Sequence, residues 1–278
     1  MIIRSDWHIH SNNSYDASLP LETIAEGARK LGLKNIGITD HLNLNDAFFK
    51  GCIKASVKNV KELNEKYPEI IPGVELTPID KPQFDYIAKN GTNKGVNYTD
   101  IVNPYDKLEL GMSKEELMAC GVRYGVGGVH WAFGLDNSAN ADKNALSKEH
   151  FRQMLFLASD ERVTILAHPW WNGAGVWFDD FSQIPRSMNM EVAAALKENK
   201  KYVECNQFML TTPKATEKFK KQYAEFIREL FEMGVPVTFG SDSHNTYAEH
   251  IDEAEKLLSA VGFVEGEFSD LDQKDLWF

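Results

Sequence analysis

The sequence predicts an α/β fold, a distorted, TIM-like (β/α)7 barrel in which seven strands alternate with helices. Two observations lead to this prediction. Short apolar runs alternate along the chain with segments whose apolar residues recur at helical spacing, and such alternation is typical of parallel strands joined by right-handed crossovers. Polar residues, histidines above all, directly follow the apolar runs, and the C-terminal ends of barrel strands are where such barrels place their chemistry.

The composition is that of an ordinary globular protein, with 43% hydrophobic and 26% charged residues among 278. No linker-like stretch and no internal repeat divides the chain. We therefore expect one domain over residues 1–278, with an irregular insertion at about 76–110. The formal net charge of −11, without any run of basic residues, makes long nucleic acid an unexpected partner.

The three cysteines, Cys52, Cys120 and Cys205, lack the paired spacing of a disulfide framework or a cysteine-based zinc site. Together with the absence of a signal-peptide pattern and of a membrane-length apolar run, this predicts a cytoplasmic protein without a membrane partner. The oligomeric state is left open by the sequence.

The expected strands are short apolar runs, each followed by a polar residue or a loop signal. They are the run that begins at Ile2, then 35–39, 70–74, 124–129, 163–167, 201–205 and 235–239. Between them, apolar residues at helical spacing predict helices at 19–31, 56–67, 113–121, from 147 onward, 190–199, 214–233 and 247–260.

Local signals support several of these helices. Pro20 suits a first helical turn, and Gly32 suits a helix end. Ser113 and Glu116 have the spacing of a capping box. Two segments lack periodicity, 76–110 and 170–188, and we expect the first to form a lid or an interaction arm.

The first strand carries the most informative pattern, because His8 and His10 are separated by one apolar residue. Alternate residues of a strand point to the same side, so both imidazoles should leave the strand end together, with Asp6 below them. Two neutral imidazole nitrogens can bind one divalent metal ion.

The same polar pattern recurs at most of the other strand ends. Six of the eight histidines and two carboxylates fall there, and one more carboxylate lies in the loop after the first strand. Crowded imidazoles without a metal would be mutually unfavourable when protonated, so the set predicts a metal centre. Its expected members are His8, His10, Asp16, His41, Glu75, His130, His168, Asp242 and His244.

Other polar residues are expected to have structural roles. We place His150 and His250 on helix surfaces. Cys205 should pack in the core, and Glu204, one strand position below the rim, should be a structural hydrogen-bonding group.

Taken in order, the segments HIH, SYD followed by Ser18, ITDH, PGVE, GVH, AHP, VECN and GSDSH resemble the PHP (polymerase and histidinol phosphatase) superfamily. The resemblance extends from Asp6 to Gly262. It implies a distorted seven-stranded barrel with a trinuclear metal centre. Carried over by matching positions, the first ion would be held by His8, His10, Glu75 and Asp242.

The resemblance also implies the ligands of the other two ions. Glu75 would bridge to a second ion held by His130 and His168. The third would be held by Asp16, His41 and His244. Many members place the aspartate five residues after the second histidine, where this chain has Tyr15. Asp16 follows Tyr15, a spacing known among histidinol-phosphatase-like members.

Nitrogen and oxygen donors suit zinc, manganese or iron, so we expect three divalent ions of these kinds. Three such ions carry more positive charge than three carboxylates and a bridging hydroxide can balance, by about two units. A phosphate monoester dianion would neutralise this surplus. We therefore predict a metal-dependent phosphatase that uses a metal-bound hydroxide against a small phosphate monoester. Glu75, Asp242 and His244 would serve catalysis through that hydroxide.

Residues around the mouth of the site are harder to assign. Arg186, in the loop after the fifth strand, is a candidate phosphate clamp, and a solvated loop arginine is the alternative. Four tryptophans could line the mouth or pack beneath the loops: Trp131, Trp170, Trp171 and Trp177.

Several other functions stay open at this point. The chain could be a histidinol-phosphate phosphatase specifically, or a phosphodiesterase or nuclease that acts on nucleotides or short nucleic acid. A lactone or amide hydrolase is disfavoured by the surplus positive charge. A non-catalytic metal-binding module is disfavoured because every matched ligand position is intact.

Overall fold

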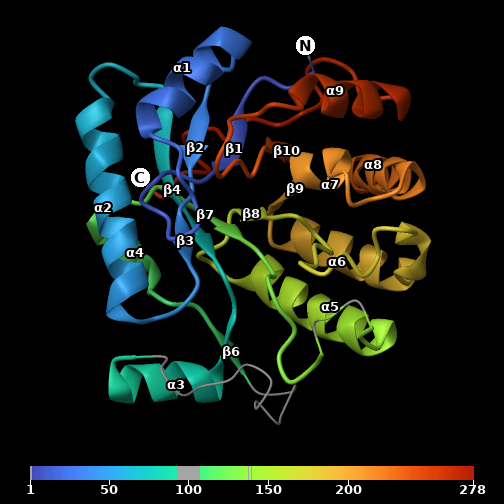
Figure 1. Ribbon diagram of the computed structural model, residues 1–278, viewed down its shortest axis with the longest axis horizontal. Coiled ribbons are helices and arrows are strands. Elements are labelled where there is room, and N and C mark those ends of the chain that lie inside the picture. The colour runs from blue at the N-terminus through green and yellow to red at the C-terminus, as the bar shows by residue number, and fades with distance from the viewer. Residues whose placement is uncertain (1, 93–106, 137, 139) are drawn as a thin grey trace.

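The structure is a computed structural model that describes residues 2–92, 107–136, 138 and 140–278. Its centre is a nearly closed barrel of parallel strands in the order β1–β2–β4–β7–β8–β9–β10 (Figure 1). Their bounds are β1 (Asp6–Ile9), β2 (Ile36–Ile38), β4 (Ile70–Leu76), β7 (Tyr124–Gly127), β8 (Ile165–Leu166), β9 (Tyr202–Asn206) and β10 (Val237–Gly240). The predicted seven-stranded α/β barrel is confirmed.

A short extra strand and the barrel closure bring the polar segments together. Strand β3 (His41–Leu42) pairs in parallel with β4 and places His41 opposite Glu75. At the closure, an isolated bridge joins Ile9 to Ser243, and the Asp242 amide donates to the carbonyl of His8 over 2.8 Å. The first and last polar segments of the chain are therefore neighbours.

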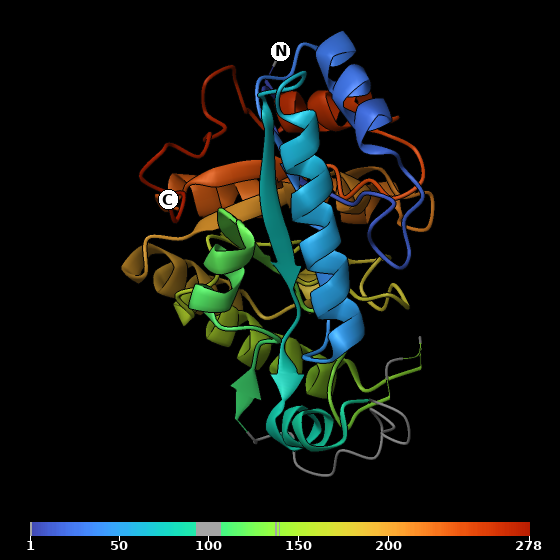
Figure 2. The same ribbon diagram turned by 90° about the vertical axis from the view of Figure 1, so that its left-hand side faces the viewer.

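Helices surround the barrel (Figures 1 and 2). They are α1 (Leu21–Leu31), α2 (Ala47–Leu63), α3 (Lys81–Asn90), α4 (Lys114–Cys120), α5 (Lys143–Ser159), the 3-10 helix η2 (Phe181–Gln183), α6 (Arg186–Glu198), α7 (Gln207–Thr211), α8 (Glu217–Glu232) and α9 (Ile251–Ala260). Helix α1 ends at Gly32, whose φ of 73° suits glycine. The capping box of Ser113 and Glu116 is confirmed at the start of α4.

Three helices begin earlier than the sequence predicts. Helix α2 starts at Ala47 rather than at Ser56, because the Asp46 side chain accepts from the Phe49 amide and caps it. Asp142 caps α5 in the same way, four residues before the expected start. Helix α6 begins at Arg186, inside the segment expected to be irregular.

The segment 76–110 is more regular than expected. Strand β5 (Ile79–Asp80) pairs antiparallel with β6 (Leu108–Glu109), and α3 follows β5. Pro82 sits in the first turn of α3, and Gly91 ends it with a φ of 71°. In Figures 1 and 2, α3 lies at the lower edge, away from the other helices. The remainder of the predicted insertion, 93–106, falls outside the described residues.

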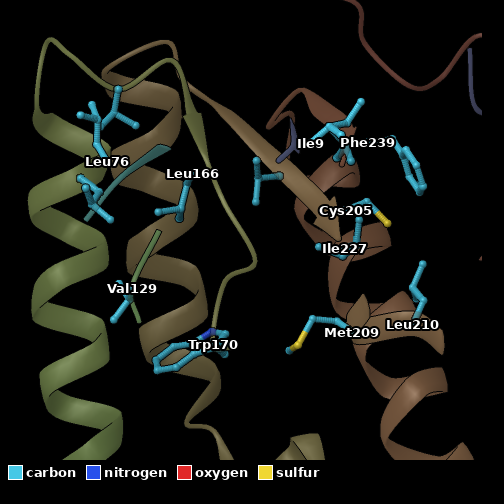
Figure 3. Packing of buried hydrophobic residues seen from close by; sticks show 14 of the residues in the cluster. Ile9, Leu76, Val129, Leu166, Trp170, Cys205, Met209, Leu210, Ile227 and Phe239 are labelled. Carbon is cyan, nitrogen blue, oxygen red and sulfur yellow. The ribbon is translucent and has the colours of Figure 1, made fainter. Parts of the chain in front are cut away.

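The apolar core lies between the barrel and its helices, and Figure 3 shows part of it, including Cys205 as predicted. Two of the tryptophans considered for the mouth, Trp170 and Trp177, are instead buried in this core with their rings 6.0 Å apart. His150 is also fully buried, edge-on to Trp177, so its prediction as a surface residue is wrong. Trp177, from the segment after β8, packs against the His150 ring at 5.2 Å between centroids.

The C-terminal segment closes the end of the barrel opposite to the polar segments. Leu271 packs with Trp7 and Tyr124, and the Trp277 amide donates to the carbonyl of Arg123 over 2.8 Å. Tyr202, at the start of β9, donates to Asp275. Among the described residues, no helix combines the length and apolarity that crossing a membrane requires.

Candidate metal centre

The innermost part of the site is formed by the ends of β1, β4 and β10. The Nε2 atoms of His8 and His10 lie 3.1 Å apart. They lie 3.4 and 3.5 Å from Oε2 of Glu75, and 3.6 and 3.2 Å from Oδ1 of Asp242. Two ring nitrogens this close cannot both carry protons toward each other, whereas one divalent cation among them and the carboxylates would satisfy all four groups.

A second group of donors lies on the other oxygen of Glu75. His168 Nε2 is 2.9 Å and His130 Nε2 is 3.3 Å from Oε1 of this carboxylate. The two imidazole rings approach each other with centroids 5.1 Å apart. Glu75 therefore has one oxygen toward each group, which is the arrangement that a bridging carboxylate needs.

The outer part of the site is more exposed to solvent. His41 Nε2 lies 3.2 Å, and His244 Nε2 3.7 Å, from Oδ2 of Asp16. Nδ1 of His41 points back to Oε2 of Glu75 over 2.8 Å. The Asp16 and His244 side chains are 31% and 27% exposed, against 1% or less for Glu75 and His10. Despite its unusual spacing, Asp16 thus lies beside the histidines expected to share its ion.

Partners behind the cluster orient several ligand candidates. Glu204 Oε1 lies 2.7 Å from Nδ1 of His8, and Glu204 Oε2 accepts from the backbone amide of His168 over 2.6 Å. Asn206 donates to Glu204 and to Asp242. With Nδ1 of His8 held by a carboxylate, its Nε2 lone pair is free for a metal, as is typical of histidine ligands. The structural hydrogen-bonding role predicted for Glu204 is confirmed.

Without a metal, the surrounding protein groups shift the pKa values of the buried histidines in opposite directions. Burial, helped by the nearby His41, lowers the pKa of His10 to about 3. Burial also opposes charge on His41, but Glu75 and Asp16 outweigh it and raise the pKa of His41 to about 10. Burial favours a neutral Glu75, yet the adjacent histidines, His130 first, hold its pKa well below its usual range. The central carboxylate is therefore ionised and ready to bind cations.

The backbone around the site is closely constrained. His168 and Asp242 have positive φ angles of 25° and 54°, a conformation rare outside glycine that recurs at functional sites. A Cβ at Gly128 would lie 2.4 Å from Oε1 of Glu75 and 2.7 Å from Nε2 of His168. Glycine at this position lets the chain pass directly beside the donors.

Two tryptophans do lie at the mouth. The Trp171 ring is 5.7 Å from that of His130 and 5.6 Å from that of His168, and the Trp131 ring is 5.9 Å from that of His130. On the other side of the site, a cavity of about 390 Å³ opens beside Asp242 and His244. This space could receive the organic part of a substrate.

Arg186 is not brought into this cluster. It begins α6, its side chain is 71% exposed, and its guanidinium pairs with Glu229 of α8. An arginine held by a surface carboxylate on an outer helix does not act as a phosphate clamp at the barrel mouth, so we do not include it in the proposed site.

Sequence reasoning missed three polar residues close to the ligand candidates. Thr77 and Asn43 are almost fully buried, and the Thr77 Oγ1 lies 3.0 Å from Nδ1 of His130. Tyr15 has its ring 5.6 Å from that of His41. The signal for Thr77 was present in the sequence, since it follows Glu75 by two positions and so shares its side of the strand.

Comparison with solved structures shows the fold. The crystal structure of histidinol phosphate phosphatase from Lactococcus lactis subsp. lactis, complexed with zinc, L-histidinol and phosphate, matches with a TM-score of 0.62. The match has 18% identity over 98% of this chain and 100% of that one. The structure of a putative histidinol phosphatase from Listeria monocytogenes matches with a TM-score of 0.59 and 12% identity, over 90% and 99% of the chains.

Sequence comparison adds a relative and a family. A probable phosphatase from Acetivibrio thermocellus is 32% identical over 115 residues, which span 41% of this chain and 42% of that protein. The family model described as the PHP domain matches residues 6–262, nearly the whole chain. The resemblance noted in the sequence is thereby confirmed, and the chain belongs to the PHP domain family.

Proposed function

We propose that this protein is a metal-dependent phosphatase that hydrolyses a small-molecule phosphate monoester at a trinuclear site. The observation that carries the proposal is the convergence of eight histidine and carboxylate side chains around Glu75, in three groups of donors. The probable phosphatase that matches part of the chain and the phosphatases of the same fold support it.

The donor chemistry fits three divalent ions. The first would be held by His8, His10, Glu75 and Asp242; the second by Glu75, His130 and His168; the third by Asp16, His41 and His244. When bound, such ions activate a water molecule as nucleophile and neutralise the oxygens of a transferring phosphoryl group. Zinc is the first metal to test because the Lactococcus protein was crystallised with it, with manganese and iron as the alternatives.

The chain's own residues supply position and charge. Glu75 sets the spacing between two groups of donors because each of its oxygens faces one of them. Only three carboxylates belong to the site, so three divalent ions and a hydroxide leave about two positive charges for a phosphate dianion. A neutral lactone or amide would not use this surplus. Trp171 and Trp131 on one side, and the cavity beside Asp242 on the other, limit the size of the leaving group.

The test combines metal analysis with turnover. The purified protein is analysed for zinc, manganese and iron, and then assayed with p-nitrophenyl phosphate, L-histidinol phosphate and a panel of other monoesters. Assays before chelation, after it and after restoring each metal link activity to the ions. Bis-p-nitrophenyl phosphate, short oligonucleotides and lactones test the alternative substrates.

We expect stoichiometric metal and monoester turnover that disappears with chelation and returns with metal. The matched variants are E75Q, which should be inactive, and E62Q, which makes the same change at an exposed glutamate of α2 outside the site. Metal uptake without turnover on any ester would instead indicate a binding module. Preference for diesters at every metal condition would overturn the monoester assignment.

A further inference from the structure

A chain of hydrogen bonds behind His130 joins side chains that belong to none of the three donor groups. Thr77 follows β4 and is 1% exposed, and Asn43 follows β3 and is 3% exposed. Because β3 and β4 pair with His41 opposite Glu75 and Leu42 opposite Leu76, the register brings Asn43 beside Thr77. The third member is Tyr15, in the loop after β1.

The distances show which group donates and which accepts in this chain of hydrogen bonds. Thr77 Oγ1 and Asn43 Oδ1 are 2.6 Å apart, a length typical of O–H···O bonds, so the hydroxyl donates to the amide oxygen. Asn43 Nδ2 lies 3.2 Å from Tyr15 Oη, within the range of N–H···O bonds. Both hydroxyls can donate or accept, so it is the short 2.6 Å separation that places the amide oxygen toward Thr77 and the NH2 group toward Tyr15.

This direction determines the proton on His130. The Thr77 hydroxyl has given its only hydrogen to Asn43, so its oxygen can only accept from Nδ1 of His130, 3.0 Å away. A neutral His130 must then carry its proton on Nδ1. Its Nε2, which faces Glu75 Oε1, keeps the lone pair that a metal requires.

Two other histidines of the site use different partners. Nδ1 of His8 faces the Glu204 carboxylate, and Nδ1 of His244 faces the backbone carbonyl of Asp242 over 2.8 Å. A carboxylate or a carbonyl can only accept, so either fixes the tautomer by itself. A hydroxyl can donate or accept, and therefore Thr77 fixes the tautomer only because Asn43 takes its hydrogen.

We propose that Thr77 and Asn43 are positioning residues that hold the proton of His130 on Nδ1 and so make its Nε2 a metal ligand. The inference rests on the metal centre of the proposed function and concerns the metal-bound site, because without an ion Oε1 of Glu75 can itself accept a proton from Nε2 of His130, 3.3 Å away. Disrupting such outer partners of metal-binding histidines typically weakens metal affinity by about 10- to 100-fold.

The test measures the tautomer directly. Protein labelled with 15N-histidine is examined by long-range 1H–15N correlation NMR in zinc-loaded form, with the His130 signal assigned from H130N. We expect the Nδ1–H tautomer in the wild type and in T77S, which keeps the hydroxyl. In T77V, which loses it, the Nε2–H form should gain population. N43L keeps Thr77 but removes its acceptor, so it should also shift the tautomer.

Zinc affinity, measured by competition with a chromophoric chelator, provides the second readout. In T77V and N43L, the dissociation constant of the most weakly bound zinc ion should rise about 10- to 100-fold. T77S, which keeps the hydroxyl, should bind zinc with wild-type affinity. T238V is the matched control, because Thr238 is equally buried and its hydroxyl contacts only the carbonyl of Val203, over 3.5 Å. It should change neither readout.

The outcomes separate this inference from the proposed function. If T77V and N43L keep the wild-type tautomer and zinc affinity while the wild type binds metal and hydrolyses esters, the positioning role is wrong and the phosphatase stands. If the wild type takes up no metal, the proposed function fails, and the positioning role of Thr77 fails with it.

Discussion

The inner and outer parts of the metal centre are built differently. The inner donors, His8, His10 and Glu75, lie at the ends of the barrel strands β1 and β4 and are almost completely buried. The outer donors include Asp16 from a loop and His244 from the segment after β10, and both are about one-third exposed or slightly less. Strand ends fix the inner donors through the sheet hydrogen bonds, whereas loop donors depend on fewer contacts. We therefore expect tight inner metal sites and an outer ion that exchanges more readily.

Glu75 is the residue where the two parts meet, so replacing it should have the largest effect. E75Q keeps the size of the side chain but removes the charge that faces five histidines. Removing one partner of a buried ion pair costs about 3–5 kcal/mol. We therefore expect metal affinity to fall by at least about 100-fold at each of the three groups of donors. Metal content after gel filtration and turnover of p-nitrophenyl phosphate measure this.

E204Q is the control for that variant, since Glu204 lies behind His8 rather than among the donors. Its effect should be confined to about 10- to 100-fold. If E75Q retained a full complement of metal, the carboxylate would not be the link between the donor groups.

The next prediction adds a methyl group at the centre of the site. In G128A the new Cβ would meet Oε1 of Glu75 and Nε2 of His168 at distances that no relaxed structure allows, 2.4 and 2.7 Å. We expect loss of metal and activity together with a lower melting temperature. G51A, where nothing lies within 4 Å in mid-helix, should instead be stabilised by about 0.5–1 kcal/mol. Similar melting temperatures and metal contents for both variants would contradict the close approach.

A series of increasing chelator concentrations tests whether the outer ion exchanges faster than the inner ions. With increasing EDTA, the wild type should release one ion well before the others, and D16N should lack this early phase. H10N should weaken a site whose donors are buried and leave the early phase present. Metal released against time, followed with a zinc indicator, separates the two variants. Simultaneous release of all ions in the wild type would show that the site acts as one unit.

The smallest expected effect is a pH dependence of the metal-free protein. The pKa of His41 is raised to about 10, above its ordinary 6.5, by Glu75 and Asp16 acting against burial. Its charge therefore stabilises the fold fully below pH 6.5, and this contribution is lost as the pH rises toward about 10. In EDTA, the melting temperature of the wild type should fall over this range, and that of H41N should fall less.

The metal-loaded protein should behave differently, because a histidine that binds a metal is already deprotonated. Its melting temperature should not show the decline that depends on His41. If H41N and the wild type followed the same curve in EDTA, the ion pairs of His41 with Glu75 and Asp16 would contribute nothing to stability.

The barrel and the converging donors could be predicted from the sequence for one physical reason. Parallel strands bring their C-terminal ends to one rim, so polar residues after separate apolar runs must meet there. This reasoning needs no knowledge of loop structure. It identified His168 and Asp242 as readily as His8, although both adopt positive φ angles that no pattern indicated.

The errors arose where local patterns do not report tertiary contacts. The start of α2 depends on the cap at Asp46, and the apolar pattern becomes regular only later in the helix. The burial of His150 depends on Trp177, which comes from a segment outside the helix. Arg186 was judged by its distance along the chain from a strand, whereas its partner Glu229 lies on another helix. Its role required the packing of α6 and α8.

The way in which the barrel is sealed has a consequence for how the chain folds. Strand β1 completes its closure only against β10, and Leu271 covers Trp7 and Tyr124 at the opposite end. These contacts join segments separated by most of the sequence, and such long-range contacts form slowly. During synthesis on the ribosome, β1 therefore stays unpaired on its β10 side, and Trp7 stays exposed, until the residues beyond 237 have been synthesised.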